Sequence, residues 1–147
     1  MSALERATRL ASLDLDDLLR RADDPGAIME GVRGDLETSI IHLRQEIVGA
    51  VIRRGHLAAQ LRDAEQRAAE IEQQARAELE RGEERAARRI LSWEIPTLAS
   101  RDVLRDEVHR AGRSLRELLS CLVRVENRAH RMGWGSRRCS RGEREGH

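Results

Sequence analysis

The sequence predicts an all-α protein: a short amphipathic N-terminal helix followed by a long antiparallel two-helix coiled-coil hairpin. Three observations support this fold class. The composition is typical of long helices. Apolar residues recur at spacings of three and four through most of the chain. A glycine-containing turn divides this pattern into two stretches whose apolar residues match when one is folded back on the other.

The composition limits both the core and the function. The 147 residues suit one domain, and they include no Phe, no Tyr and only two Trp. Charged residues make up 36% of the chain, with a net charge of only +1. A compact core of large side chains is therefore not expected. The near-zero net charge also argues against a general nucleic-acid binder, so no nucleic-acid partner is expected.

Residues 1–23 are expected to form the amphipathic N-terminal helix. Its apolar arc consists of Ala3, Leu4, Ala7, Leu10 and Ala11. Asp14 falls within the arc and interrupts it. An amphipathic helix with arginines beside its apolar arc can lie in a membrane interface. The residues assigned to membrane binding on this basis are Leu4, Arg6, Ala7, Arg9, Leu10 and Ala11.

Asp23, Asp24 and Pro25 are expected to form a hinge between this helix and the hairpin. Proline disfavours α geometry at the residue before it, so the first helix should stop near Asp23. Asp24 can cap a new helix, and Pro25 fits the first helical position, where its missing N–H is not needed.

Residues 25–132 are expected to form the hairpin, with its turn at about 81–83. Gly82 is a helix C-cap signal, and Pro96 should kink or break the second arm. The second arm has the most regular heptad spacing in the chain. The residues assigned to the seam between the arms are Leu36, Leu43, Ile47, Leu57, Leu61, Val108, Leu115, Leu118, Leu122 and Val125.

Residues 133–147 are expected to form a disordered basic tail. Trp134 lies near several arginines, so contact with a membrane surface or with RNA stays open beside the simpler interpretation of a solvated terminus. The two cysteines, Cys121 and Cys139, lie in no metal-ligand pattern, and packing is the expected role of Cys121.

The sequence contains no pattern typical of an enzyme. Phosphate-binding glycine loops, metal-binding histidine pairs and nucleophile elbows are all missing. No catalytic residue, metal, cofactor or small-molecule substrate is expected. No apolar run is long enough to span a bilayer, and the charged N-terminus does not resemble a signal peptide, so a cytoplasmic protein is expected.

Two functional interpretations remain open from the residues alone. The N-terminal helix can bind anionic lipids, weakly per copy, so that useful membrane affinity needs many copies in one assembly. Alternatively, the helix packs on the hairpin, on a second subunit or on a partner protein, and the chain is a soluble coiled-coil adaptor or regulator.

Three short segments resemble a known family. Ala22-Asp23-Asp24-Pro25 resembles the junction between the first helix and the hairpin in phage-shock protein A and the vesicle-inducing plastid proteins, which are relatives of ESCRT-III. The Gly34–Glu37 segment resembles the acidic step that follows this junction. The Leu79–Leu91 segment resembles the tip of the family's hairpin. The resemblance covers residues 3–132.

The resemblance implies a peripheral membrane protein at the cytoplasmic face of the cell membrane, one that forms homo-oligomers and acts in membrane maintenance or envelope stress. It also implies an AAA+ activator as a partner. Family members continue with further helices after the hairpin. We therefore expect a C-terminally short member that co-assembles with a longer one.

Overall fold

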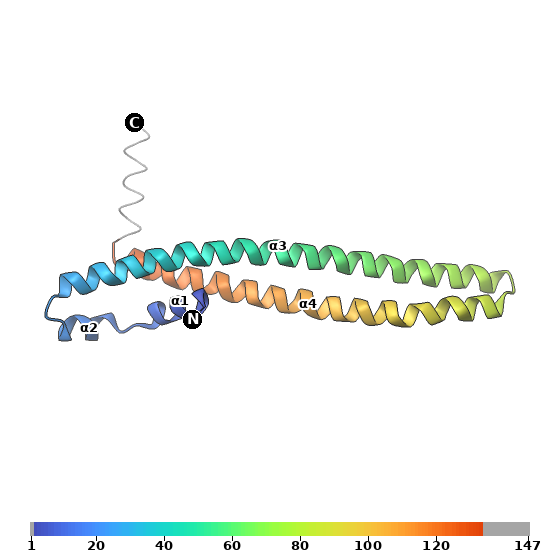
Figure 1. Ribbon diagram of the computed structural model, residues 1–147, viewed down its shortest axis with the longest axis horizontal. Helices are drawn as coiled ribbons and strands as arrows, with labels where there is room; N and C mark the ends of the chain where they lie inside the picture. Colours follow the sequence, from blue (N-terminus) through green and yellow to red (C-terminus); the bar gives the residue numbers. More distant parts are fainter. Residues whose placement is uncertain (1, 134–147) are drawn as a thin grey trace, which may run out of the picture. The chain divides into compact units, whose positions relative to one another are not determined.

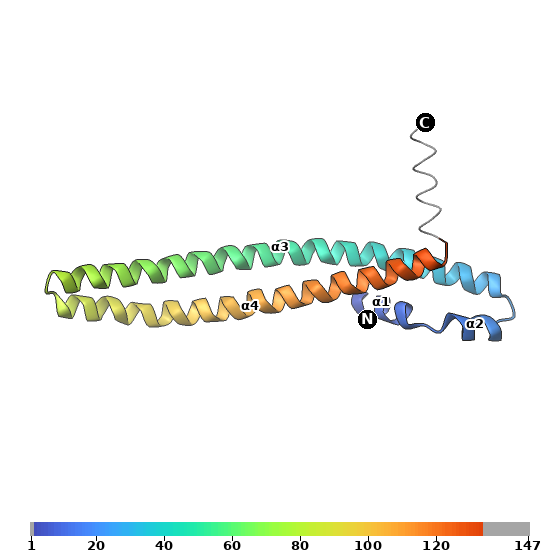
Figure 2. The same cartoon turned by 180° about the vertical axis from the view of Figure 1, so that it is seen from behind.

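The computed structural model describes residues 2–133, which form four α-helices (Figure 1, Figure 2). They are α1 (Ala3–Ser12), α2 (Leu15–Arg21), α3 (Pro25–Glu80) and α4 (Glu84–Arg131). The two long helices, α3 and α4, pack together as a helical hairpin, which confirms the predicted all-α fold class. The described part of the chain contains no strand. The tail predicted at residues 133–147 lies outside the described residues, apart from Gly133.

The contacts divide the chain into two compact units. Among the described residues, the first combines those up to Gly49 with those from Leu115 to Gly133, and the second is Ala50–Ser114. Each unit therefore contains a stretch of α3 and a stretch of α4.

The N-terminal segment forms two helices where the sequence predicted one. Leu13 is extended and ends α1, and Asp14 caps α2 by accepting a hydrogen bond from the Asp17 backbone N–H at 3.1 Å. The Asp14 carboxylate satisfies a free N–H of a new first turn, which favours a helix start at this position over helix continuation. α1 has its own cap, because the Ser2 hydroxyl accepts from the Glu5 N–H at 3.1 Å.

α3 begins at the junction of Asp24 and Pro25. The Asp24 side chain accepts a hydrogen bond from the Ala27 N–H at 3.2 Å. Pro25 is the first residue of α3, where a missing N–H leaves no intrahelical bond unmade. Ala22, which follows α2, is extended. The chain therefore has non-helical backbone directly before a capped helix start.

In the first unit, α3 and α4 enclose an aliphatic core. The large side chains that are fully buried are Leu36, Ile40, Leu43 and Val125. An ion pair between Arg44 and Glu126, with an N–O distance of 2.8 Å, joins the two helices beside this core. The pair is half exposed, so it contributes about 1 kcal/mol or less, and burial of the aliphatic side chains dominates the stability of the unit.

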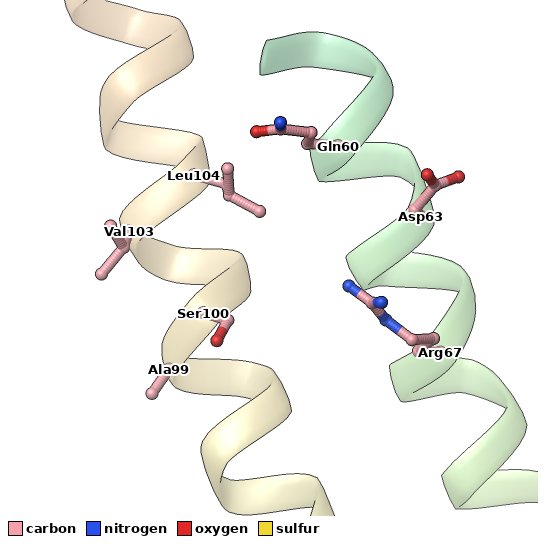
Figure 3. A pocket seen from close by; sticks show the side chains of 7 residues that line it. All are labelled: Gln60, Asp63, Arg67, Ala99, Ser100, Val103 and Leu104. Carbon is pink, nitrogen blue, oxygen red and sulfur yellow. The ribbon is translucent and has the colours of Figure 1, made fainter. Parts of the chain in front are cut away.

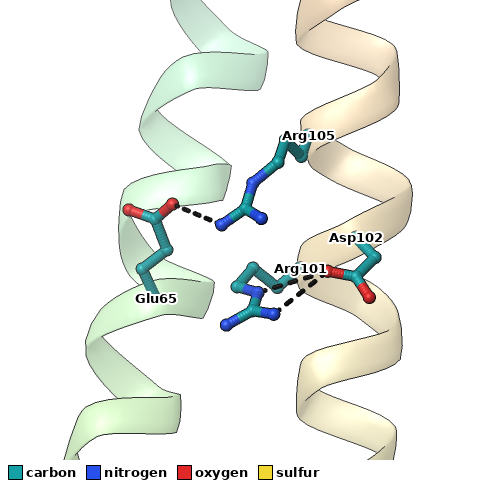
Figure 4. Close-up of polar contacts among 4 residues, drawn as sticks. All are labelled: Glu65, Arg101, Asp102 and Arg105. Carbon is teal, nitrogen blue, oxygen red and sulfur yellow. Dashed lines mark hydrogen bonds and ion pairs between the residues drawn. The ribbon is translucent and has the colours of Figure 1, made fainter.

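In the second unit, small residues form much of the contact between α3 and α4. The buried residues here include Ala64, Ala68, Ala75 and Ala87. Arg105 forms an ion pair with Glu65 across the helices at 3.6 Å, and Arg101 pairs with its neighbour Asp102 at 3.2 Å (Figure 4). Alanine side chains bury little area each, so this unit has fewer large apolar contacts than the first.

The turn between α3 and α4 is a Schellman motif at Gly82. The Gly82 N–H donates to the Leu79 carbonyl at 3.0 Å, and the Glu83 N–H donates to the Glu78 carbonyl at 2.9 Å. Gly82 has φ of 79°, a left-handed conformation that glycine adopts without a steric penalty. The reversal of the chain is therefore built from local backbone hydrogen bonds.

α4 continues through Pro96 without ending there. Proline inside a helix removes one backbone hydrogen bond and crowds the preceding turn. Thr97, the next residue, donates its hydroxyl to the Trp93 carbonyl at 3.0 Å. α4 is therefore continuous at Pro96 despite a local cost of about 3 kcal/mol.

We predict that Leu43→Ala lowers the free energy of unfolding by about 2–5 kcal/mol, because Leu43 is completely buried between the helices. Ile41→Ala is the matched control, since Ile41 is 50% exposed on the same helix. It should change the stability by less than about 1 kcal/mol. Urea unfolding followed by circular dichroism measures both values. Equal losses in the two variants would contradict this description of the core.

Candidate functional site

The candidate site is the surface where α1 lies against α3 and α4 within the first unit. Ala7 is fully buried and Ala3 is 5% exposed, although both belong to a short N-terminal helix. The Thr8 hydroxyl and the Cys121 sulfur of α4 lie 3.8 Å apart, within hydrogen-bond distance for sulfur. The alanine side of α1 therefore faces the hairpin.

Two arginines of α4 hold the end of α1. The Arg128 guanidinium donates to the Ala11 carbonyl at 2.9 Å and also to the Leu13 carbonyl. Arg124 donates to the Ser12 hydroxyl at 3.4 Å. The last carbonyls of a helix lack intrahelical partners and carry partial negative charge, so a cation is favourable at this end. Arg128 thus caps a helix that belongs to another part of the sequence.

The residues assigned to membrane binding do not share one environment. Ala7 is buried against the hairpin, whereas Arg6 and Arg9 are exposed. Leu4, Leu10 and Ala11 are half-buried. In this arrangement the apolar side of α1 is partly covered by the protein itself, so full contact of that side with lipid requires α1 to leave α3 and α4.

The residues assigned to the seam lie at different depths. Those that are buried in the first unit are Leu36, Leu43, Leu115, Leu118 and Val125. Ile47 and Leu122 are half-buried in the same unit. Leu57, Leu61 and Val108 are half-buried in the second unit. Deep burial of assigned seam residues is thus confined to the unit that also carries α1.

Sequence reasoning missed the residues of α4 that contact α1. Arg124 and Arg128 look like solvent-facing charges of a heptad repeat, and nothing in their spacing points to a third helix. No sequence signal points to this contact, because Cys121, which is 4% exposed, lies three residues after Leu118 and four before Val125 and so looks like an ordinary residue of the seam. In the structure, the sulfur of Cys121 faces α1.

A cleft of about 410 Å³ lies between α1 and α3. α1 contributes Arg6, Arg9 and Leu10 to its walls. The residues from α3 that line it are Asp35, Thr38, Ser39 and His42. The cleft therefore combines two guanidinium groups with hydroxyl and imidazole groups, all of which can donate hydrogen bonds.

The opposite side of the first unit carries exposed aliphatic side chains. Val48 lies nine residues from Ser39, about two and a half turns, so it points away from the cleft. Leu119 and Val123 each lie two residues from Cys121, roughly 200° around α4. Ile41, Val48, Leu119 and Val123 are between 44% and 59% exposed. We call these four residues the exposed aliphatic face.

A second cleft, of about 630 Å³, lies between α3 and α4 in the second unit. Figure 3 shows Gln60 and Arg67 of α3 and Leu104 of α4 directed into the space between the helices. The other residues that line the cleft are Asp63 of α3 and Ala99, Ser100 and Val103 of α4. It contains no grouping of side chains typical of a catalytic site.

Residues 2–133 contain no cluster of three or more side chains suited to bind a metal ion. Over the same residues, no helix is both long enough and apolar enough to cross a lipid bilayer.

Curated relatives of this chain are named membrane-associated protein Vipp1 or phage shock protein A homologue. The chain is 23% identical over 128 residues to the membrane-associated protein Vipp1 of Nostoc punctiforme, which covers 87% of this chain and 50% of the relative. It is 30% identical over 91 residues to a phage shock protein A homologue of Deinococcus radiodurans, covering 62% of this chain and 41% of the relative. A Vipp1 of Synechocystis is 28% identical over 92 residues, or 63% of this chain and 34% of the relative.

No family model matches the chain. The chain spans half or less of the length of each of these three relatives. The names of these relatives agree with the family that the sequence resembles. The helical hairpin is the fold that this resemblance predicts. The similarities to Vipp1 and to a phage shock protein A homologue, at modest identity, support assignment of this chain to the phage-shock protein A and Vipp1 family.

Proposed function

We propose that this chain is a peripheral membrane-binding, self-assembling protein of the phage-shock type, acting in membrane maintenance or envelope stress at the inner face of the cell membrane. One observation carries the proposal: α1 is an amphipathic helix that few contacts hold on the hairpin. The names of the relatives, which describe membrane association for two of them, support it. The proposal assigns no catalytic activity to the chain.

The contacts that hold α1 are few enough for reversible release. Burial of the Ala3 and Ala7 methyl groups contributes about 1–2 kcal/mol together, and half-buried Leu4 and Leu10 contribute roughly 1 kcal/mol each. The hydrogen bonds from Arg128 are partly exposed, so each contributes on the order of 1 kcal/mol. A lipid surface that offers a few kcal/mol to α1 can therefore compete with the hairpin for it.

Released α1 has the residues that an interfacial helix needs. Leu4 and Leu10 would enter the acyl boundary, while Arg6 and Arg9 would pair with anionic phosphate groups. Each leucine contributes roughly 1.5–3 kcal/mol when fully buried, so one copy binds weakly. Strong membrane binding then depends on several copies within one assembly.

The exposed aliphatic face gives a basis for self-assembly. Its four side chains gather on the side of the first unit that α1 does not cover, and their burial between copies would be favourable. This face stays exposed whether α1 is docked or released. It therefore suits contacts with a second copy or with a longer family member, as the proposed co-assembly requires.

A second candidate function is a soluble adaptor or regulator, and the docked position of α1 favours it. In that case α1 is a structural part of the first unit, and a protein partner such as an AAA+ activator binds the hairpin. The two candidates differ in what α1 contacts when it acts, so they can be separated by testing α1 against lipid.

We predict that the wild-type chain co-sediments with phosphatidylglycerol vesicles and that the double variant Leu4→Asp, Leu10→Asp does not, because two carboxylates cannot enter the acyl boundary. Leu18→Asp is the matched control, since Leu18 is a partly exposed leucine of α2, outside the proposed contact. It should bind like the wild type. Negligible binding of the wild-type chain would reject the membrane function and favour the adaptor.

We predict that Arg128→Ala increases the vesicle-bound fraction by about tenfold at limiting lipid, because loss of about 1–2 kcal/mol shifts α1 toward release. Arg131→Ala is the control, since Arg131 is an exposed arginine of the same helix turn. Without vesicles, a maleimide reagent should modify Cys121 faster in Arg128→Ala, in a Cys139→Ser background. Unchanged Cys121 reactivity would show that Arg128 does not hold α1.

We predict that Val48→Asp combined with Val123→Asp converts the self-assembled chain to a smaller species, because it places charges in the exposed aliphatic face. Ile95→Asp, at a site 72% exposed in the second unit, should leave assembly unchanged. Sedimentation velocity over a range of protein concentrations measures the size. A wild-type chain that stays monomeric at all concentrations would reject self-assembly.

A further inference from the structure

The cleft between α1 and α3 brings together hydrogen-bond donors from the short N-terminal helix and from the first long helix of the hairpin. α1 contributes Arg6 and Arg9, which are three residues apart and therefore neighbours on its surface. α3 contributes Ser39 and His42, which are also three residues apart. The volume of about 410 Å³ is in the range of small-molecule sites.

The two guanidinium groups have no acidic partner. Among residues 2–133, no carboxylate lies within 4.0 Å of Arg6 or Arg9, although eight other ion pairs are formed. Most of those pairs join neighbouring turns of one helix. Arginine matches the geometry of phosphate oxygens with paired donors, so two unpaired arginines beside a cleft favour an anionic ligand.

The wall contributed by α3 provides a further free donor. Ser39 is only 7% exposed, and within the described part of the chain its hydroxyl has no hydrogen-bond partner. Among residues 2–133 no buried side-chain nitrogen or oxygen lacks a hydrogen-bond partner, so the Ser39 hydroxyl oxygen is accessible at the cleft, where it can donate to a ligand oxygen. His42, one turn further along α3, lines the same wall and can donate from its ring.

Asp35 also lines the cleft, and its charge opposes an anion. It pairs with neither arginine, so the guanidinium groups outnumber the carboxylate at this site. The excess of positive charge, together with the hydroxyl donor, favours a compact anion with several oxygens. A phosphate monoester has this chemistry, and an uncharged or cationic ligand does not.

We infer that the cleft binds a phosphate group, either inorganic phosphate or a phosphate monoester, between α1 and α3. The arginines of α1 hold the phosphate oxygens from one side, and the Ser39 hydroxyl and His42 ring hold them from the other. Because the ligand touches both helices, its binding stabilises the docked position of α1. The source is either free phosphate or the headgroup of a lipid such as phosphatidic acid.

This site stands apart from the proposed membrane function. It requires α1 to be docked, whereas lipid insertion of α1 requires its release. A soluble ligand can therefore test the site in the absence of vesicles, and failure of one proposal leaves the other intact.

Isothermal titration calorimetry of the full chain with inorganic phosphate tests the inference. Arg9→Gln and Ser39→Ala should each weaken binding, by about tenfold for the arginine, which loses charge-assisted hydrogen bonds. Asp35→Asn should strengthen binding, because a like charge is removed. Arg53→Gln is the matched control, since Arg53 is an exposed arginine of α3 outside the cleft. It should bind like the wild type.

Two further measurements locate the ligand and its source. Phosphate should slow maleimide modification of Cys121 in a Cys139→Ser background, and it should not do so in Arg9→Gln. Dihexanoyl phosphatidic acid that binds more tightly than inorganic phosphate would assign the lipid source, and equal affinities would assign free phosphate. No detectable binding, an equal loss in Arg53→Gln, or wild-type affinity in Ser39→Ala would overturn the inference.

Discussion

The packing of α3 against α4 is the interaction on which the rest of the structure depends. Neither long helix can bury its apolar stripe alone, and the chain has no Phe or Tyr with which to build a wider core. In the first unit, Leu36, Leu43 and Val125 exclude water between the helices. That pairing also creates the surface on which α1 docks, because the docked helix contacts both partners. α1 alone is ten residues long and would be marginal in water.

The sequence was sufficient to predict features that depend on local chemistry. The alternation of threes and fours, the left-handed preference of Gly82 and the cap at Asp24 each act within a few residues, so they are readable from the chain alone. The end of α1 at Leu13 was not predicted, although Asp14 interrupts the apolar arc there. In the sequence, an aspartate that caps a new helix cannot be distinguished from an aspartate that only interrupts the apolar side of one continuous helix.

The docking of α1 could not be predicted for a different reason. Arg128 meets the Ala11 and Leu13 carbonyls across more than a hundred residues of sequence. The sequence around an arginine on a polar helix face does not indicate which hydrogen-bond acceptor the arginine will contact. The wheel of α1 correctly indicated one apolar side, but the identity of the surface that covers this side is a tertiary property. A lipid surface and the hairpin can each cover the apolar side of a small amphipathic helix. The composition of the helix therefore does not indicate which of the two covers it.

Opposing demands on α1 link the proposed functions. The hairpin retains α1 through buried alanines, partly covered leucines and a few hydrogen bonds, while a membrane would cover the leucines fully and pair with the arginines. The far side of the first unit keeps its aliphatic residues exposed in either case. The chain can thus present the same assembly surface with α1 in two positions, and the phosphate-binding cleft would exist in only one of them.

Ala7 sets the clearance between α1 and the hairpin. A methyl group is the smallest side chain that still excludes water, so its complete burial allows the α1 backbone to approach α4 closely. The reach of Arg128 to two main-chain oxygens depends on that closeness. The hairpin therefore recognises α1 through its main-chain oxygens and through the small side chain at Ala7. The larger side chains of α1 are half-buried or exposed, so they can serve contacts with a different surface.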